Sequence, residues 1–168
     1  MICEHGYVPH RFGTGINVPV VKDRLGDLSC ASNYKPITLS PIISKKFEYC
    51  ILHKYEHLLQ SDDLQLGFKK NSSCPHALFV LTATIEHFIT HGSKVHASLN
   101  ATKAFDRVHH VKLFQKLIYK GLPGGIIKIL VDWYGKMFSI VKWNNSYSSS
   151  YSIKTGIRQG VILSPFFI

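Results

Sequence analysis

Two short blocks of the sequence combine basic side chains with glycine, a combination suited to contact with phosphate groups. Arg158 stands two residues before Gly160: an arginine can bind phosphate oxygens, and a glycine lets a ligand approach the backbone closely. Lys69 and Lys70 follow a Gly-Phe pair that predicts a turn, and lysines there can reach the phosphates of a nucleic acid. Each of these basic residues could equally be a solvated surface charge, and the sequence leaves both interpretations open.

The overall composition favours a polyanionic partner. The 168 residues include 20 lysines and arginines against 10 acidic residues, which gives a formal charge of +10. With 45% hydrophobic and 12% aromatic residues, the chain can form one domain with its own core, so a disordered tail is excluded. Nucleic acid is the commonest partner of a basic folded domain, although the charge could serve solubility alone. No apolar stretch is long enough to cross a membrane.

Histidine and cysteine spacing does not indicate a transition-metal site. His53 with His57, and His87 with His91, are i,i+4 pairs that could face one way on a helix. Zinc needs three or four ligands, and neither pair carries the glutamate of an H-E-x-x-H motif. The cysteines form no C-x-x-C pair, which fits reduced thiols in an intracellular protein. These cysteines are Cys3, Cys30, Cys50 and Cys74.

Hydrophobic periodicity and turn signals place these residues on an α+β fold without an internal repeat. Ser40 as N-cap with Pro41 at the first helical position predicts one helix start, and Pro75 and Gly92 predict the two ends of another helix. The expected helices cover residues 40–59, 75–92, 111–119 and 126–137. The expected strands cover residues 16–21 and 95–99, and a hairpin of 139–143 with 151–157 around Asn144 and Asn145; residues 1–35 are otherwise expected to be irregular.

Four sequence blocks appear in one order along the chain, and together they are more specific than any one alone. The first is Asn-Tyr-Lys-Pro-Ile-Thr-Leu at 33–39, running into Ser-Lys-Lys-Phe-Glu at 44–48, and the second is Gly-Phe-Lys-Lys at 67–70. The third is Ser-Leu-Asn-Ala-Thr-Lys-Ala-Phe-Asp-Arg-Val at 98–108, and the fourth is Gly-Ile-Arg-Gln-Gly-Val-Ile-Leu-Ser-Pro at 156–165. From about Val18 to its last residue, the chain resembles the reverse transcriptases of non-LTR (LINE-type) retrotransposons, which carry NYRPI, GF(R/K), LD-x-x-KAFD and RQG-x-x-LSP.

This resemblance implies the fold of a right hand, with residues 1–92 as a fingers-like region and residues 93–168 as a partial palm-like region. It implies RNA-directed DNA synthesis, with an RNA template, a DNA primer and two Mg²⁺ ions held by palm aspartates. The family's Tyr-x-Asp-Asp hairpin and thumb are expected after the Leu-Ser-Pro block, and the sequence stops before them. The chain is therefore expected to be a truncated piece, and nothing in it indicates a membrane or a protein partner.

Asn100 stands where the family has the first metal-binding aspartate of LD-x-x-KAFD. Mg²⁺ is a hard cation that requires anionic oxygen ligands, and an asparagine amide carries no charge. Asn100 could be a harmless polar residue at the end of a strand, but the flanking matches favour a lost ligand. We therefore expect the chain to bind no Mg²⁺ and to be inactive as a polymerase by itself. The alternatives are a decayed element without function and a non-catalytic, basic nucleic-acid-binding remnant, in which Tyr147 and Tyr151 could stack on bases.

The resemblance also assigns contact with nucleotide or template to other residues of these blocks. Phe105 is expected under the sugar of an incoming nucleotide, although an ordinary core aromatic is an equal alternative. Gln159 and Gly160 belong to the segment that lies against template and nucleotide. Lys35 replaces the family's usual arginine, so it keeps the charge and loses the bidentate fork. Asp106 is expected to be a helix-start or structural carboxylate, not a metal ligand.

Overall fold

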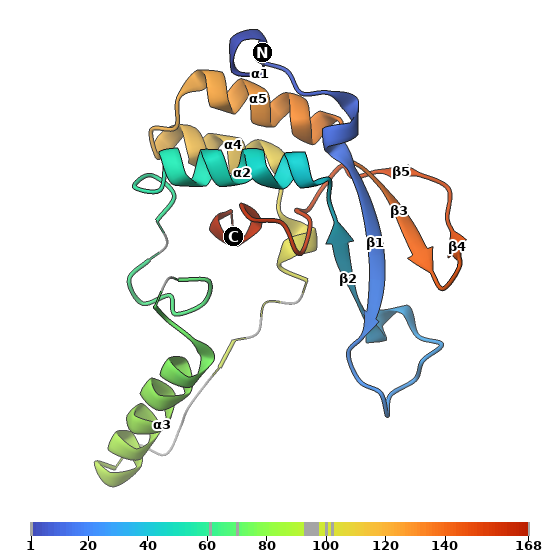
Figure 1. The fold of residues 1–168 in the computed structure, drawn as a ribbon. Helices are drawn as coiled ribbons and strands as arrows, with labels where there is room; N and C mark the ends of the chain where they lie inside the picture. Colours follow the sequence, from blue (N-terminus) through green and yellow to red (C-terminus); the bar gives the residue numbers. More distant parts are fainter. Residues whose placement is uncertain are drawn as a thin grey trace. The chain divides into compact units, whose positions relative to one another are not determined.

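The computed structural model describes residues 2–60, 62–69, 71–92, 98–99, 101 and 103–167. The chain divides into two compact units, of which the first is Met1–Leu59 with Lys103–Ile168 and the second is Gln60–Thr102. The first unit contains the sheet and most of the helices (Figure 1). The described part of the second unit contains one long helix, α3 (Cys74–Thr90).

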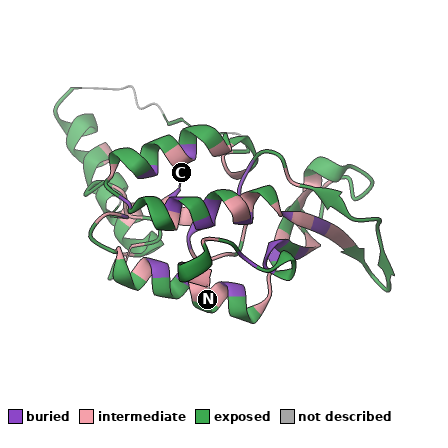
Figure 2. Ribbon diagram, turned by 90° about the horizontal axis from the view of Figure 1, so that it is seen from above, coloured by how far each residue is buried: buried purple, intermediate pink, exposed green. Residues whose placement is uncertain are grey.

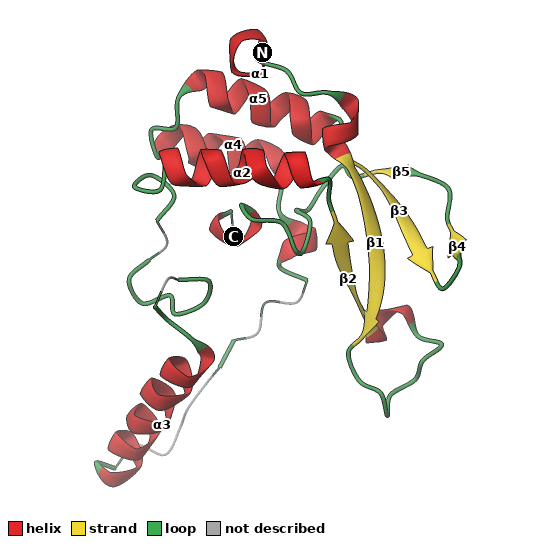
Figure 3. Ribbon diagram, in the orientation of Figure 1, coloured by secondary structure: helices red, strands yellow, loops and turns green. Residues whose placement is uncertain are grey.

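The strands of the first unit form one mixed sheet (Figure 3). Strand β1 (Thr14–Val21) pairs antiparallel with β2 (Tyr34–Leu39) and parallel with β3 (Phe138–Trp143). Two short strands, β4 (Ser146–Tyr147) and β5 (Tyr151–Ser152), both pair antiparallel with β3. The parallel partner of β1 therefore comes from the other end of the chain, and the sheet depends on non-local pairing.

Strands β1 and β2 each contain a proline, and the two prolines lie opposite each other where both strands are at an edge of the sheet. Pro19 lies opposite Pro36 in the register of the two strands. Strand β3 accompanies β1 only from Thr14 to Asn17, so β1 is itself an edge strand at Pro19. A proline has no N–H to donate, and an edge position leaves that donor unneeded. Both prolines are thus compatible with the strands that contain them.

Three helices of the first unit pack around a shared apolar core. They are α2 (Ile42–Lys54), α4 (His110–Tyr119) and α5 (Gly124–Gly135), and they lie side by side in both Figure 1 and Figure 2. The buried apolar residues of these helices are Ile51, Leu113, Leu117, Ile127, Ile129, Leu130 and Trp133. Each such side chain contributes about 1.5–3 kcal/mol when fully buried. Among the described residues no strand contributes to the buried apolar core, which comes from these helices and from the segments between the elements.

Polar contacts hold the chain before β1 on α5. Asp132 accepts the Val8 N–H at 2.8 Å and the Lys136 ammonium at 2.7 Å, and Lys136 also donates to Val8 O at 3.0 Å. Burial by itself raises the pKa of Asp132, but the bonds from Lys136 and Val8 outweigh it and leave the pKa below its usual value. The first residues also form a short helix, α1 (Ile2–His5). The region expected to be irregular is therefore ordered by tertiary contacts.

The expected helices are confirmed, with shifted ends in α2 and in α5, which covers Gly124–Gly135 in place of the expected residues 126–137. Pro75 lies in the first turn of α3 and Gly92 follows its end at φ +98°, as expected. Pro41, not Ser40, is the N-cap of α2, because the backbone of Pro41 is still extended at φ −56° and ψ 140°. Helix α2 also stops at Lys54, short of the expected residue 59.

The expected strands agree less well with the structure. Residues 16–21 lie within β1. The expected hairpin of 139–143 with 151–157 is confirmed only where β3 pairs with β5, and the turn at Asn144 and Asn145 joins β3 to the unexpected strand β4. The expected strand at 151–157 is regular only in β5, because the chain from Gly156 onward makes other contacts. Strand β2 was not expected, because the proline of its Lys-Pro pair disfavours the interior of a strand. Of the expected strand at 95–99, residues 95–97 lie outside the described residues, and Ser98 and Leu99 belong to no strand.

The mixture of helices with a mixed sheet confirms the α+β class. The division into a fingers-like region, 1–92, and a palm-like region, 93–168, stays a prediction. The compact units have other boundaries, because residues on both sides of the second unit pack together in the first. No described helix has both the length and the apolar character needed to cross a membrane.

A methyl group at Gly13 tests the close packing between the chain before β1 and the end of α5. The Cβ of an alanine there would lie 1.8 Å from Lys136 O, so the backbone would have to shift. We expect Gly13→Ala to lower the free energy of unfolding by about 2–3 kcal/mol, measured by urea denaturation. Gly125→Ala, in α5 with no atom within 4 Å, is the matched control. It is expected to be neutral or to stabilise by up to about 1 kcal/mol, and equal effects of the two changes would contradict tight packing at Gly13.

Candidate functional site

The 156–164 segment bonds through its backbone to two other sequence blocks of the first unit. Its first two N–H groups donate to Val108 O and Phe105 O, each at 2.8 Å. Gln159 O, further along the segment, accepts the Thr38 N–H of β2 at 2.9 Å. Three of the four sequence blocks therefore meet at one place.

The start of this segment requires a glycine. Gly156 has φ +82°, a conformation that residues with a side chain rarely adopt. A Cβ on Gly156 would lie 2.9 Å from both the Cα and the carbonyl oxygen of Asp106. The Gly156 carbonyl oxygen also lies 2.7 Å from Nε2 of His110. Glycine thus lets the segment lie directly against the short 3₁₀ helix Phe105–Arg107.

A cavity of about 240 Å³ lies between the sheet and the 156–164 segment. On its sheet side the Thr38 hydroxyl donates to Asn17 Oδ1 at 2.7 Å, and Asn17 Nδ2 donates to the Tyr151 hydroxyl at 2.8 Å. The residues that line it are Asn17, Pro19, Pro36, Thr38, Asp106, Val141, Tyr151, Ile153, Thr155, Gly156, Ile157, Arg158 and Gln159. The cavity thus combines an apolar floor with a polar network, and the stacking of Tyr151 on bases stays a prediction.

Arg158 is buried, with 6% of its surface exposed. Its guanidinium donates to three backbone carbonyls: Gly13 O, Phe138 O at 2.8 Å and Thr14 O at 3.4 Å. These carbonyls lie at the starts of β1 and β3, so one side chain joins both strands to the 156–164 segment. Burial lowers the pKa of Arg158 to about 10, so the group stays charged at neutral pH. The alternative of a surface charge is wrong; contact with a phosphate stays a prediction, and two of its three nitrogens already have backbone partners.

Glu48 approaches the same segment from α2. Its side chain is buried, with 7% of the residue exposed, and its carboxylate accepts the Ile162 N–H at 2.7 Å. Burial raises the pKa of Glu48 to about 7, although the N–H groups of Ile162 and Leu163 and the charge of Arg158 oppose the shift. A buried carboxyl group on α2 and a buried guanidinium within the segment thus line the same small cavity.

Glu48 ends the stretch that follows the first sequence block, but the sequence analysis assigned it no role. The buried residues of α2 are Ser44, Glu48 and Ile51, which share one face at helical spacing. An acidic residue on the inward face of an amphipathic helix was the signal that could have identified it. Its hydrogen-bond partner lies more than 100 residues away, with a separation of 114, and no local pattern predicts that contact.

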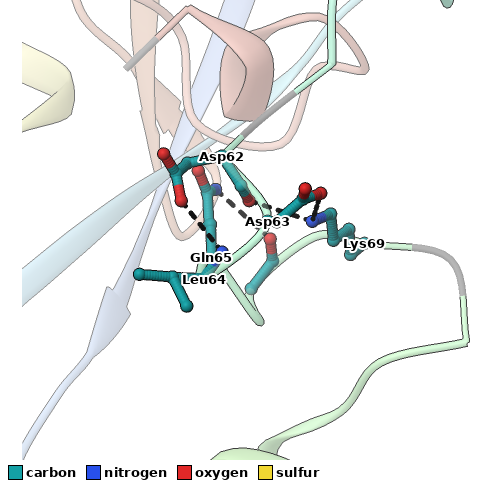
Figure 4. A network of polar contacts seen from close by, with 6 residues as sticks. Asp62, Asp63, Leu64, Gln65 and Lys69 are labelled. Atoms are coloured by element: carbon teal, nitrogen blue, oxygen red, sulfur yellow. Dashed lines mark hydrogen bonds and ion pairs between the residues drawn. The ribbon is translucent and has the colours of Figure 1, made fainter.

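Lys69 closes a turn in the second unit (Figure 4). Its ammonium donates to Asp62 O at 2.9 Å and lies 3.4 Å from Asp63 Oδ1. Asp62 Oδ1 accepts the Leu64 N–H at 2.9 Å, which shapes the same turn. Because the Asp63 side chain is fully exposed, the ion pair contributes little stability. Contact of Lys69 with phosphates stays a prediction, and Lys70 lies outside the described residues.

The chain is similar to a known protein family over most of its length. The sequence model described as reverse transcriptase (RNA-dependent DNA polymerase) matches residues 21–168. This chain belongs to the reverse transcriptase family. The matched range contains all four sequence blocks, so the resemblance to reverse transcriptases is confirmed.

Curated relatives of this reverse transcriptase chain come from transposable elements. The probable RNA-directed DNA polymerase from transposon X-element of Drosophila melanogaster is 29% identical over 170 residues, covering 95% of the chain and 18% of that protein. The corresponding protein from transposon BS of the same species is 28% identical over 138 residues, covering 79% and 15%. A Pol polyprotein from type-1 retrotransposable element R2 of Popillia japonica is 23% identical over 163 residues, covering 96% and 23%. The chain spans about a fifth of the length of these relatives.

The structure brings some of the expected reverse transcriptase residues together. The Phe105 carbonyl accepts the N–H of Ile157, which lies two residues before Gln159. The Phe105 side chain is partly buried against the apolar core. Gln159 is half-buried, and Gly160 is exposed with φ +94°. Lys35 is exposed on β2. The contacts of these four residues with nucleotide or template stay predictions, and Asn100 lies outside the described residues.

Reverse transcriptases use divalent cations, and the described residues of this chain show no group of side chains that fits such an ion. Within the described ranges no three histidine, cysteine or acidic side chains lie together. Asn100, at the family's aspartate position, supplies a neutral amide in any geometry. Asp106 is the one carboxylate of the third block, and it lies inside a 3₁₀ helix, not at its N-cap. A hard cation requires several anionic oxygens, so this donor set does not suit Mg²⁺.

Substituting Arg158 separates its structural role from a phosphate contact. Arg158→Lys keeps the charge, but one ammonium cannot donate to three carbonyls of two strands. We expect a loss of about 2–4 kcal/mol in the free energy of unfolding, measured by urea denaturation. Lys35→Gln, which removes an exposed cation from the same sheet, is expected to change that free energy by less than about 0.5 kcal/mol. A fully stable Arg158→Lys chain would show that the carbonyl bonds do not hold β1 and β3.

Proposed function

We propose that this chain is a piece of a non-LTR retrotransposon reverse transcriptase whose 156–160 block holds template and incoming nucleotide. The observation that carries the proposal is the set of backbone bonds that join this block to residues 33–39 and 104–108. The names of the relatives, RNA-directed DNA polymerases from transposons, support the same assignment. An RNA template and a DNA primer are the partners that this function implies.

In this proposal residues 1–92 belong to the fingers and residues 93–168 to part of the palm of a right-hand polymerase. The order of the four blocks along the chain supports this division. The bond between Thr38 N–H and Gln159 O then joins the fingers to the palm at the position of the nucleotide.

These 168 residues do not polymerise by themselves in this proposal. Phosphoryl transfer of this kind needs two cations that stabilise the attacking and leaving oxygens, and carboxylates must hold them. Asn100 offers no charge. The acidic residues that follow it are Asp106 and Asp132, and Asp132 is bonded to Lys136 on the helix α5. The part of the chain that the structure describes therefore offers no group of anionic ligands for the reaction.

The purified chain is expected to give no primer extension on an RNA template with either Mg²⁺ or Mn²⁺. Asn100→Asp alone is not expected to restore extension, because one carboxylate cannot hold two ions. A labelled primer resolved on a gel measures both, with an active reverse transcriptase as positive control. Templated incorporation that disappears in Gln159→Ala would overturn the proposed inactivity. Extension gained through Asn100→Asp would show that the remaining ligands are present in these residues.

One face of the sheet favours a second, non-catalytic function, the binding of nucleic acid. Lys35 lies opposite Val20 and Ile16 lies opposite Ile140, so Lys35 and Lys142 share this face with the apolar residues between them. Both lysines are exposed, and Val20 is 49% exposed, which shows that the face is open there. Lysines above an accessible apolar surface suit phosphates and bases together.

Removing these two lysines tests the binding function. The double variant Lys35→Gln, Lys142→Gln is expected to weaken binding of a single-stranded RNA and to reduce the slope of log K against log salt by about 1.4. Fluorescence anisotropy of a labelled oligonucleotide over a series of NaCl concentrations measures this slope. Lys112→Gln, Lys116→Gln on α4 makes the same change in net charge and is expected to leave the slope nearly unchanged. Equal effects of the two pairs would argue against a binding face on the sheet.

A further inference from the structure

Glu48 is a buried acid that forms no ion pair with another described residue. It accepts the Ile162 N–H at 2.7 Å, and the ion pairs found among the described residues do not include it. The guanidinium of Arg158, the nearest candidate in the core, is bonded to backbone carbonyls. A buried carboxyl group in such surroundings favours its neutral form.

A small cavity of about 20 Å³ adjoins Glu48 between α2, α5 and the 156–164 segment. Tyr134, Ser40 and Arg158 line it together with Glu48. Ser40 Oγ and Arg158 Nε are buried and have no hydrogen-bond partner among the described residues. A space of this size accommodates about one water molecule. The carboxyl group therefore faces polar atoms but no bulk solvent while the segment covers it.

We propose that Glu48 is a positioning residue that couples the placement of the 156–164 segment to a proton: the segment closes over α2 while Glu48 is neutral and loosens when Glu48 ionises. The physical reason is that an open segment gives the carboxylate water, whereas the closed segment withholds it. This inference rests on the proposed function in one respect, namely that Gln159 and Gly160 of the segment contact nucleic acid.

The groups that face Glu48 determine the pH range of this coupling. Burial is the largest influence and raises the pKa, while the N–H groups of Ile162 and Leu163 and the charges of Arg158 and Lys45 lower it; the result is a pKa of about 7 in place of 4.5. Because the pKa is higher in the closed segment than in an open one, closure is most stable at low pH. That stability falls as the pH rises from 4.5 to about 7 and is level above this range.

Amide hydrogen exchange of Ile162 and Leu163 in the full chain, followed by NMR between pH 5 and pH 8, tests the coupling. Protection of these amides, corrected for intrinsic exchange, is expected to fall about tenfold for each pH unit up to pH 7. Glu48→Gln keeps an oxygen acceptor for the Ile162 N–H and cannot ionise. In this variant the protection of the Ile162 and Leu163 amides is expected not to change with pH. At pH 8 it is expected to be at least about tenfold higher than in the unsubstituted chain. Ser44→Ala, on the same buried face of α2, is the matched control and keeps the fall.

Histidines change charge over the same pH range, so the comparison between variants is essential. All the variants keep the ten histidines, including His110, whose Nε2 contacts Gly156 O; the difference between them therefore isolates Glu48. A flat profile in the unsubstituted chain, or parallel profiles in that chain and Glu48→Gln, overturns the proposal. If Glu48→Gln does not fold, a ¹³C titration of the Glu48 carboxyl carbon decides. A midpoint near pH 7 supports the coupling, and a midpoint near pH 4.5 overturns it.

The exchange experiment contains no nucleic acid, so its failure and a failure of the proposed function are distinguishable. A chain that shows the pH-dependent fall but binds no oligonucleotide overturns the proposed function and supports the coupling. A chain that binds RNA with a flat exchange profile overturns the coupling alone.

Discussion

The buried guanidinium of Arg158 is the interaction on which the arrangement of the first unit depends. Strands β1 and β3 come from opposite ends of the chain and are parallel, so no turn between them sets their positions. Arg158 donates to carbonyls at the start of each strand, and its own carbonyl accepts the Ser164 hydroxyl at 2.6 Å. Buried carbonyls without donors would cost about 1–3 kcal/mol each. One side chain thus satisfies these carbonyls and determines where the 156–164 segment leaves the sheet.

Two buried ionisable groups, Arg158 within this segment and Glu48 on α2, line one small cavity, and their hydrogen-bond partners differ. Arg158 has three carbonyl oxygens as partners, which offset much of the desolvation of its charge. Glu48 has backbone N–H groups and no paired cation among the described residues, so its desolvation is offset less completely. Arg158 therefore stays charged and in place, whereas Glu48 makes the position of the segment sensitive to pH. The segment that carries Gln159 is held firmly at its start and more weakly near Ile162.

The parts of the fold that depend on local signals could be predicted from the sequence. Helix α3 follows from Pro75 and Gly92, and the turn that ends β3 follows from two asparagines. Strand β2 was missed because a Lys-Pro pair lowers its strand propensity, and only pairing with β1 makes it a strand. The buried structural role of Arg158 was not foreseen for the same reason. Its partners Thr14 and Gly13 lie 144 and 145 residues away, and no local pattern distinguishes such an arginine from a surface one.

The contacts that join the sequence blocks are made mainly by backbone atoms. The arrangement of the blocks therefore depends little on the side chains that would take part in a reaction. The N–H groups of residues 156 and 157 and the carbonyls of residues 108 and 105 bond in the same way whatever side chains flank them, apart from the glycine at 156. An amide in place of a carboxylate at Asn100 removes the negative charge needed for a metal ion without removing any of these bonds. The residues that hold the described site together, Arg158 and Glu48, are not the residues that would bind the cations. The backbone contacts therefore explain why the sequence blocks lie together, whereas the number of carboxylates decides whether the proposed reaction can occur.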